Sequence, residues 1–277
     1  MRRLLCDNKR ERGMALVLVL LVLSVLTAMV VEFAYGIYVN TSLLTNWQRL
    51  QEISMAAESG VSMGAEFLKS VPDDYRKKNV LRQFPIPPMD PFGLGIRISA
   101  IVEDENSKLN LNYLEKLTGG GTEKYYDALI RLLRALELKE SLAEAIRDHM
   151  YGIGTVKVEM SSVEELLSVA GIDREVYNTL LPYVTVYGDG SININTADVP
   201  VLMSLGEITR SEAEDIFNSN KKPFKDKSVL GFTPLISYGL EGSFFRVISR
   251  AMDEDGLTRE IHCVIDRNAN VLYWREL

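Results

Sequence analysis

The stretch from Met14 to Val31 constrains this chain more than any other feature of its sequence. It carries no charged side chain, and only the hydroxyl groups of Ser24 and Thr27 interrupt its apolar character. A hydrocarbon core of roughly 30 Å needs about 20 mostly apolar helical residues to cross it. Because the apolar character resumes after Glu32, the sequence predicts a membrane-spanning helix close to the N-terminus.

Charge divides the chain around this stretch. The residues before it carry more basic than acidic side chains, whereas the whole chain has a net charge of −7. A basic flank stays in the cytoplasm, so the acidic remainder is expected across the membrane, in the periplasm of a Gram-negative bacterium. The acidic balance argues against broad attraction to nucleic acid. Cys6 and Cys263 are expected on opposite sides of the membrane, which excludes a disulfide within the chain.

A helical pattern continues past the apolar stretch. Between Asn40 and Lys69 apolar residues recur at steps of three and four, which is typical of an amphipathic helix, and Pro72 ends the pattern. The sequence therefore predicts one helix from Met14 to Lys69. Its first half is apolar on all sides, and its second half has a single apolar face that can pack on a globular domain.

Strand patterns lie on both sides of a long helical block. Residues 71–93 are rich in proline and predict a connector, and residues 95–102 alternate in the manner of a strand. The C-terminal part predicts an antiparallel meander with strands at 243–251, 258–266 and 271–275. A lone strand is not stable by itself, so residues 95–102 are expected to pair with this meander.

Residues 113 to about 235 have a helical pattern. A capping box of Ser161 and Glu164 and a cap at Asp173 mark two of the helix starts. Helices are expected at residues 123–138, 139–150, 161–170, 173–181, 196–205 and 211–218. The predicted fold class is therefore α+β, with a helical block inserted into a smaller domain of one long helix and a sheet.

Two segments of this block share an apolar–Asn–apolar–Asn pattern before a helix. They are Leu109 to Asn112 and Ile192 to Asn195. The apolar residues can point inward while the asparagines bond nearby backbone and cap a helix start. The repeat is explained either by two similar helical subdomains or by two ordinary capped helix starts, and both interpretations stay open.

The second of these segments also resembles the start of a helix-hairpin-helix module. DNA-binding members offer the backbone N–H groups of a Gly-hydrophobic-Gly hairpin to phosphate, with support from Lys or Arg. Here the segment from Leu205 to Arg210 has one glycine beside the acidic Glu207, and the helix that follows is acidic. This favours a structural or protein-binding module. A lysine-rich stretch, interpreted as a solvated loop, follows with Lys221, Lys222, Lys225 and Lys227.

No catalytic pattern stands out, and we expect no enzyme. His149 and His262 are isolated, and the sequence contains no HExxH, no CxxC and no Gly-rich phosphate loop. No cofactor is assigned with certainty. Calcium prefers several oxygen ligands, and acidic turns can supply them, although solvated turns are the simpler interpretation. The calcium candidates are Glu103, Asp104, Asp189, Asp253 and Asp255.

Taken together, these features resemble the K-type minor pseudopilins of type II secretion, the general secretion pathway protein K family. The resemblance covers essentially the whole chain, and its combination of motifs is specific although no single motif is. The motifs are a basic leader ending in Gly13, Ala56–Val61, Asp104 with Lys108–Asn112, Val163–Gly171, Ile192–Ala197 and Trp274–Glu276.

The resemblance implies processing at the N-terminus. In the family a prepilin peptidase cleaves after the residue that corresponds to Gly13 and methylates the new N-terminus, here Met14. Most pilins carry glutamate at the fifth mature position, which is Leu18 in this chain. K-type members lack this glutamate, which suits the end of a filament.

The resemblance also implies an architecture. This is a pilin-like fold in which a long N-terminal transmembrane helix packs on a small antiparallel sheet, interrupted by a large all-α insertion that is SAM-like or helix-hairpin-helix-like. The expected parts are a leader at 1–13, a transmembrane helix at 14–36, the first pilin-like part at 37–107, an insertion with two SAM-like subdomains at 108–240 and the C-terminal strands at 241–277.

The implied setting is the bacterial inner membrane, crossed once, and later the tip of the periplasmic pseudopilus. Implied partners are the I-type and J-type minor pseudopilins, other pseudopilins, the inner-membrane assembly platform and the prepilin peptidase. One departure is the segment from Arg147 to Gly154, which is shorter than the acidic family segment and weakens a calcium role there. Two alternatives remain: a membrane-anchored helix-hairpin-helix protein that binds DNA for uptake, and a minor type IV pilin.

Overall fold

The structure is a computed structural model. It describes residues 4–71, 82–115, 123–152, 157–219, 224 and 230–277, with side chains from Gly13 onward. The chain divides into two compact units, Met1–Ser54 and Met55–Leu277, and each is treated separately below.

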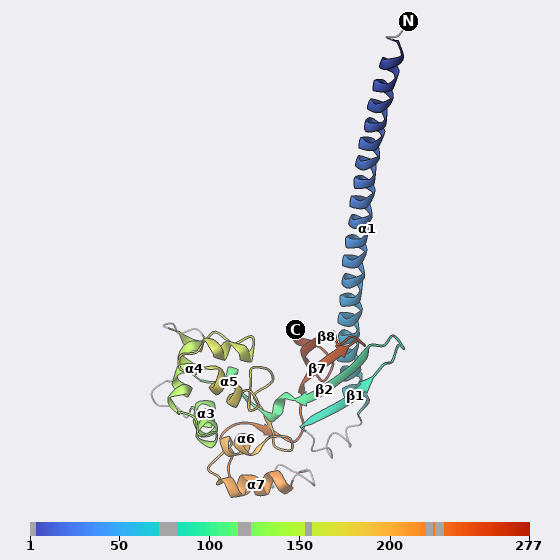
Figure 1. Cartoon of the computed structure of the whole chain (residues 1–277). Helices are drawn as coiled ribbons and strands as arrows, with labels where there is room; N and C mark the ends of the chain where they lie inside the picture. The colour runs from blue at the N-terminus through green and yellow to red at the C-terminus, as the bar shows by residue number, and fades with distance from the viewer. Residues whose placement is uncertain (1–3, 72–81, 116–122, 153–156, 220–223, 225–229) are drawn as a thin grey trace. The chain divides into compact units, whose positions relative to one another are not determined.

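Helix α1 (Leu4–Ser70) supplies the whole described part of the first unit (Figure 1). The predicted continuous helix from Met14 to Lys69 is confirmed, and it begins earlier, within the basic leader. Its two hydroxyl side chains are satisfied inside the helix, since Ser24 Oγ donates to the Leu21 carbonyl and Thr27 Oγ1 to the Leu23 carbonyl. No polar side chain between Met14 and Val31 therefore needs a partner from outside the helix.

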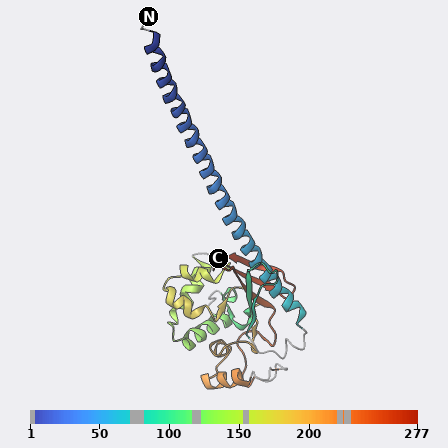
Figure 2. The same cartoon turned by 45° about the vertical axis from the view of Figure 1, so that its right-hand side comes forward.

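A five-stranded antiparallel sheet forms the base of the second unit. Its strand order is β1-β2-β7-β8-β9. The strands are β1 (Gln83–Met89), β2 (Arg97–Asp104), β7 (Phe244–Met252), β8 (Thr258–Asp266) and β9 (Val271–Glu276). Strand β2 pairs with β7 over its whole length, from Arg97 opposite Met252 to Asp104 opposite Phe245. The expected pairing of the lone strand with the C-terminal meander is therefore confirmed (Figure 2).

The proline-rich connector contains a strand that the sequence did not predict. Residues 83–89 form the edge strand β1, which pairs with β2 on one side only. Proline has no backbone N–H, so it is tolerated at an edge where one side of the strand needs no ladder hydrogen bonds. The expectation of a plain connector is wrong here, and residues 72–81 of the connector lie outside the described part.

Two glycines let α1 lie unusually close to the sheet. In the second unit, a Cβ atom on Gly60 would overlap the Ser249 hydroxyl and lie 2.8 Å from Ile98 Cγ2. A Cβ atom on Gly64 would lie 2.7 Å from Val247 Cγ1. Alanines and aliphatic residues of α1 complete this buried contact, which covers one face of β2 and β7.

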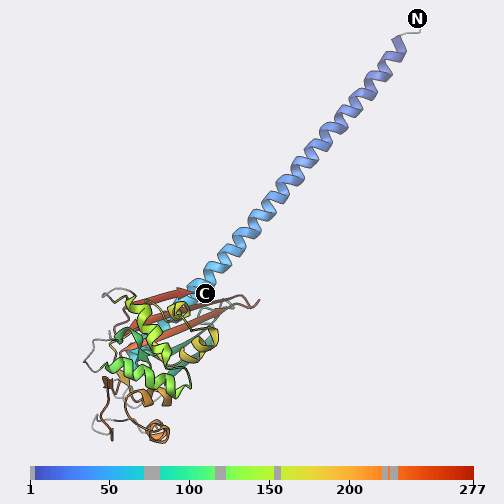
Figure 3. The ribbon, with the colours of Figure 1, turned by 90° about the vertical axis from the view of Figure 1, so that its left-hand side faces the viewer.

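A helical block stands between β2 and β7 in the sequence, and Figure 3 shows its helices in front of the strands. Its elements are η1 (Glu105–Ser107), β3 (Leu109–Asn110), η2 (Leu111–Tyr113), α3 (Lys124–Ala135), α4 (Ser141–Tyr151), η3 (Val163–Ser168), α5 (Arg174–Leu180), β4 (Val184–Thr185), β5 (Ile192–Asn193), α6 (Val199–Ser204), α7 (Arg210–Ser219) and β6 (Tyr238–Gly239).

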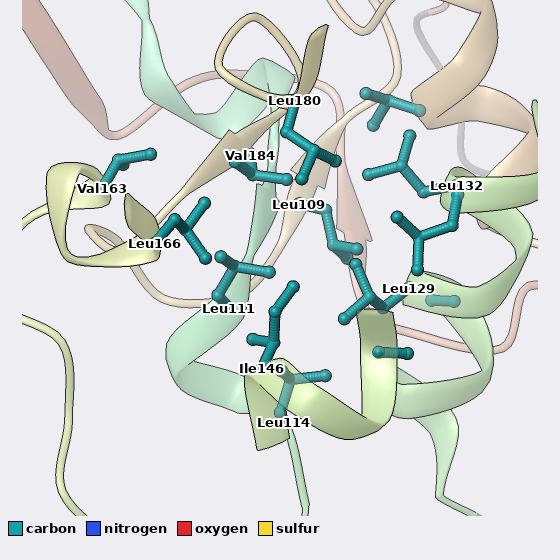
Figure 4. Close-up of a cluster of buried hydrophobic side chains, with 14 of the residues drawn as sticks. Leu109, Leu111, Leu114, Leu129, Leu132, Ile146, Val163, Leu166, Leu180 and Val184 are labelled. Carbon is teal, nitrogen blue, oxygen red and sulfur yellow. The ribbon is translucent and has the colours of Figure 1, made fainter. Parts of the chain in front are cut away.

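The block has a hydrophobic core of its own. Its buried members run from Leu109 to Ile236 and include none of the sheet residues. Side chains from η2, α3, α4, η3 and α5 converge there, as Figure 4 shows for Leu111, Leu129, Ile146 and Leu166. A continuous core is what a block needs to fold as an inserted unit.

Local capping differs from the prediction at one helix start. The expected helix at 161–170 is the short 3₁₀ helix η3, and its capping box is formed by Ser162 and Glu165, one residue later than predicted. The Glu165 carboxylate accepts from the backbone N–H of both Ser161 and Ser162. The predicted cap at Asp173 is confirmed, because its carboxylate accepts from Val176 N at 2.9 Å.

Replacing Gly60 with alanine should destabilise the second unit by about 1–3 kcal/mol. The added methyl group overpacks the contact with Ser249 and Ile98, which outweighs a gain in helix propensity of about 1 kcal/mol. Gly36→Ala is the matched control, since a Cβ atom there meets no described atom within 4 Å. Urea unfolding of the full chain in detergent measures both, and equal effects of the two substitutions would contradict the close contact.

Candidate functional site

The apolar half of α1 is the first candidate site. Apolar side chains point outward on all sides of it, with Met14 72% and Leu18 63% exposed. Among the described residues, α1 is the helix that is long and apolar enough to cross a membrane. A helix that is apolar all round is stable only in lipid or among other apolar helices, so this segment needs one of these environments.

The predicted processing residues lie at the start of this segment. Gly13 is a helical residue, and a Cβ atom there would meet no described atom within 4 Å. Packing within the described chain therefore gives no reason for glycine at this position. Cleavage after Gly13 and methylation of Met14 stay predictions.

A buried charge cluster joins the sheet to the helical block. The fully buried Glu105 accepts from Lys108 Nζ at 3.1 Å and from Arg246 Nε at 2.6 Å, and also from the Thr185 hydroxyl. Lys108 Nζ also donates to Glu103 at 3.1 Å. Three segments that are far apart in the sequence therefore meet at one carboxylate.

The charge of Glu105 is stabilised despite its burial. Burial raises its pKa, but Lys108 and Arg246 outweigh that effect and hold the pKa at about 2, below the ordinary value of 4.5. Glu105 is thus ionised at neutral pH. Because its pKa is lowered by folding, it contributes stability above about pH 4.5, and this contribution is lost as the pH falls toward 2.

The neighbouring carboxylate lies in a different environment. Asp104 is buried and forms no ion pair with a described residue, and it accepts from Asn193 Nδ2 and Thr196 Oγ1, both at 2.7 Å, and from Asn106 N at 2.9 Å. Burial raises the pKa of Asp104, although these hydrogen bonds lower it in part. A side chain on Gly242 would overlap the Asp104 carboxylate, so glycine is required at that position.

The two Asn-containing segments share several of their hydrogen bonds. The first asparagine accepts from the backbone N–H of the second, at 2.9 Å for Asn110 and 3.1 Å for Asn193. The second asparagine donates from its amide to the carbonyls of two separate later segments, which are Met160 and Val186 for Asn112, and Phe224 and Leu240 for Asn195. The hydrogen bonds are shared by both segments, and the division of the block into two similar subdomains stays a prediction.

The calcium candidates do not come together. Asp253 and Asp255 follow β7 at the end of the sheet opposite to Asp104, and Asp253 accepts from the backbone N–H of Asp255 and Leu257. Asp189 accepts from Asn106 Nδ2 and Ser191 N. Among the described residues, no group of three or more His, Cys, Asp or Glu side chains is placed to hold a metal ion. Calcium binding therefore stays a prediction without a preformed cluster.

The hairpin between α6 and α7 is covered by other parts of the block. A Cβ atom on Gly206 would lie 2.6 Å from the ring of Phe232, and the Gly206 carbonyl accepts from Arg131 at 3.1 Å. Arg131 also pairs with Glu207. A phosphate-binding hairpin needs open backbone N–H groups and free positive charge, so this geometry disfavours DNA binding. The predicted lysine-rich stretch lies outside the described residues.

Sequence reasoning missed the charge cluster. The strand pattern of residues 243–251 predicts β7, but nothing in it says that Arg246 meets Glu105 across 141 residues. The available signal was the pair of charged residues that face each other in adjacent strands, since Glu103 lies directly opposite Arg246. Using this signal requires the register between β2 and β7, which the sequence alone does not fix.

Three curated proteins named type II secretion system protein K are similar to this chain. The protein of Pseudomonas aeruginosa is 28% identical over an alignment 204 residues long, which covers 58% of this chain and 59% of that protein, less than two thirds of its length. The protein of Aeromonas hydrophila is 27% identical over 270 residues, 80% of each chain. The protein of Pectobacterium carotovorum is 45% identical over 67 residues, 22% of this chain and 20% of that protein. No family model matches the chain.

A solved structure shares the fold. It is the crystal structure of the GspK-GspI-GspJ complex from the type 2 secretion system of enterotoxigenic Escherichia coli. One chain of it matches with a TM-score of 0.59 and 19% identity, over 84% of this chain and 98% of that chain. The α+β fold with a long N-terminal apolar helix and the resemblance to K-type proteins stated from the sequence are thereby confirmed.

Replacing Arg246 with methionine should destabilise the second unit by about 3–5 kcal/mol, because it leaves the buried Glu105 short of a cation. Arg250→Met on the same strand is the matched control. The Arg250 side chain is 62% exposed and pairs with Glu260, so its loss should cost less than about 1 kcal/mol. Urea unfolding of the full chain in detergent distinguishes the two. Equal destabilisation by the two substitutions would contradict the stabilising role of Arg246 beside the buried Glu105.

Proposed function

We propose that this chain, through its similarity to type II secretion system protein K, is a minor pseudopilin at the tip of the pseudopilus. There it helps to initiate assembly of the filament and thereby protein export across the outer membrane. Its N-terminus is cytoplasmic and its globular part periplasmic, with one pass through the inner membrane. It acts by assembly rather than by catalysis.

The observation that carries this proposal is the division of α1 into two kinds of surface. Residues from Met14 to Tyr38 expose apolar side chains, whereas residues of α1 in the second unit are buried against a sheet. A subunit that first waits in lipid and later joins a filament needs such a helix. Neighbouring apolar helices can then replace the lipid without a change in the globular unit.

The position of the chain in the filament follows from Leu18. If cleavage occurs after Gly13, Leu18 is the fifth residue of the mature chain, and it is apolar and exposed. A carboxylate at this position can pair with the N-terminal amine of an adjacent subunit inside the filament. A subunit without the carboxylate makes no such pair, which suits the first subunit rather than one in the shaft.

The proposed partners are the I-type and J-type minor pseudopilins, followed by other pseudopilins and the inner-membrane assembly platform. The support is that the matching solved chain belongs to a GspK-GspI-GspJ complex. A membrane-anchored DNA receptor is the weaker alternative, because the α6–α7 hairpin is covered by Phe232 and Arg131. A minor type IV pilin is a related filament alternative, and the helical block and Leu18 argue against it.

Co-expression with a prepilin peptidase should remove residues 1–13 and leave N-methylated Met14, as measured by intact-protein and peptide mass spectrometry. Gly13→Val should block cleavage, because the peptidase must accept the residue before the cut bond. Gly36→Ala is the control, since it changes a glycine of the same helix that likewise meets no described atom within 4 Å. Cleavage beyond the apolar stretch, or no cleavage of the unaltered chain, would refute the assignment.

The unaltered chain should co-purify from membranes with the I-type and J-type pseudopilins of the same organism in a defined complex. The physical reason is that the exposed apolar half of α1 gains helical neighbours when subunits associate. Size-exclusion chromatography with light scattering measures the assembly. Tight binding of duplex DNA that falls steeply with salt, together with no co-purification, would instead support the DNA receptor.

A further inference from the structure

A cleft opens on the face of the sheet that α1 does not cover. Val247 faces α1, so the side chains of Arg246 and Ile248 lie on the opposite face. They line the cleft together with Tyr177 and Leu181 of the helical block, and its volume is about 700 Å³. Pockets of roughly 300–1,000 Å³ suit a small ligand or a few residues of a peptide.

Arg246 brings unused hydrogen-bond donors to this cleft. Its Nε donates to Glu105, and its guanidinium carbon lies 5.8 Å from the centre of the Tyr187 ring. No described residue accepts a hydrogen bond from its Nη1 or Nη2, although the side chain is only 12% exposed. The outer fork of a fixed guanidinium is suited to a carboxylate, which can accept two parallel hydrogen bonds.

Tyr177 adds a second donor. The residue is buried, it lines the same cleft, and its hydroxyl has no partner among the described residues. Burial raises the pKa of Tyr177 in the first place, and the charge of Glu164 adds to this, so the hydroxyl stays protonated at neutral pH. Because this hydroxyl is protonated and makes no hydrogen bond to a described residue, a ligand in the cleft can accept from it.

The other charges of the cleft are already paired. Glu103 accepts from Lys108 at 3.1 Å, and Glu164 lies 3.3 Å from Arg275. Arg82 lies 3.0 Å from Asp198, and the His262 ring, which is a cation only when protonated, lies 2.7 Å from Glu260. A basic ligand would therefore have to displace a protein cation. An acidic ligand can use the free fork of Arg246 directly, so charge complementarity favours an anion.

Part of the lining of the cleft is apolar. Leu181 is 38% exposed there, and Pro182 and Ile248 lie beside the cleft as well. An aliphatic residue next to the ligand's carboxylate can bury its side chain on this apolar part. A cleft of this volume is also larger than a lone carboxylate needs. Both features point to a peptide rather than to an inorganic anion.

We propose that this cleft is a binding site for a carboxylate-bearing peptide segment. The carboxylate accepts from Arg246 Nη1 and Nη2 and from the Tyr177 hydroxyl, and an adjacent aliphatic side chain packs on Leu181. The carboxylate can belong to an Asp or Glu side chain or to a chain's C-terminus. The site is separate from the processing site and from the apolar half of α1, and it does not depend on the proposed place of the chain in a filament.

The test uses the full chain in detergent and three dye-labelled pentapeptides, measured by fluorescence anisotropy. One has glutamate between leucines and an amidated C-terminus, the second has glutamine in its place, and the third has glutamine and a free C-terminal carboxylate. At least one of the two carboxylate-bearing peptides should bind at least about tenfold more tightly than the amidated glutamine peptide. Comparison of the first and third peptides identifies the source of the carboxylate.

Two variants locate the site. Leu181→Glu puts a competing carboxylate on the rim and should weaken binding at least about tenfold, and Tyr177→Phe should weaken it several-fold through loss of one donor. Leu257→Glu is the matched control. Leu257 is 36% exposed, in the turn after β7 at the other end of the sheet, so its substitution should leave binding unchanged.

Unchanged unfolding midpoints of the variants would establish that a loss of binding is not a loss of fold. Equal affinities for the glutamate peptide and both glutamine peptides would overturn the proposal. So would unaltered binding by Leu181→Glu, or no binding of any of the three peptides up to millimolar concentration.

Discussion

The second unit depends on one buried carboxylate. Glu105 follows β2 directly and binds Lys108 of the helical block, Arg246 of β7 and Thr185 of β4. Removing a carboxylate from water is costly, and the cost is offset only when cations and hydrogen bonds surround it with good geometry. Because these partners come from segments far apart in the sequence, the cluster forms only when sheet and block are correctly joined. It therefore selects one arrangement of the two parts.

A different constraint governs α1, which meets two environments along one continuous helix. Near Met14 the helix is apolar on every side, as lipid or a helical neighbour requires. At Gly60 and Gly64 the helix has no side chain, so its backbone can approach β2 and β7 closely. The same helix thus exposes an apolar surface at one end and packs on a sheet at the other, and a substitution at one end should leave the other end unaffected.

Hydropathy patterns predicted most helices and strands well, because buried residues recur at a regular spacing along both kinds of element. These patterns predicted α1 and the C-terminal meander. They also predicted that β2 pairs with this meander, since a lone strand must pair somewhere. They failed at β1, where the prolines indicate a connector but an edge strand tolerates them. They also failed at Arg246, because its partners depend on strand register. The processing role of Gly13, by contrast, rests on the resemblance to the K-type family and stays a prediction.

The location of the charge cluster explains how a sheet can accept so long an insertion. The chain leaves the sheet after Asp104 and returns at Phe244, and Asp104 lies opposite Phe245 in the β2–β7 ladder. The two ends of the insertion are therefore strand neighbours, and the ladder closes without strain whatever lies between them. The block in turn has a separate core, so it needs little from the sheet except orientation. Glu105 and Asp104 supply that orientation at the entry point, since one binds β7 and the other binds the start of the second Asn-containing repeat.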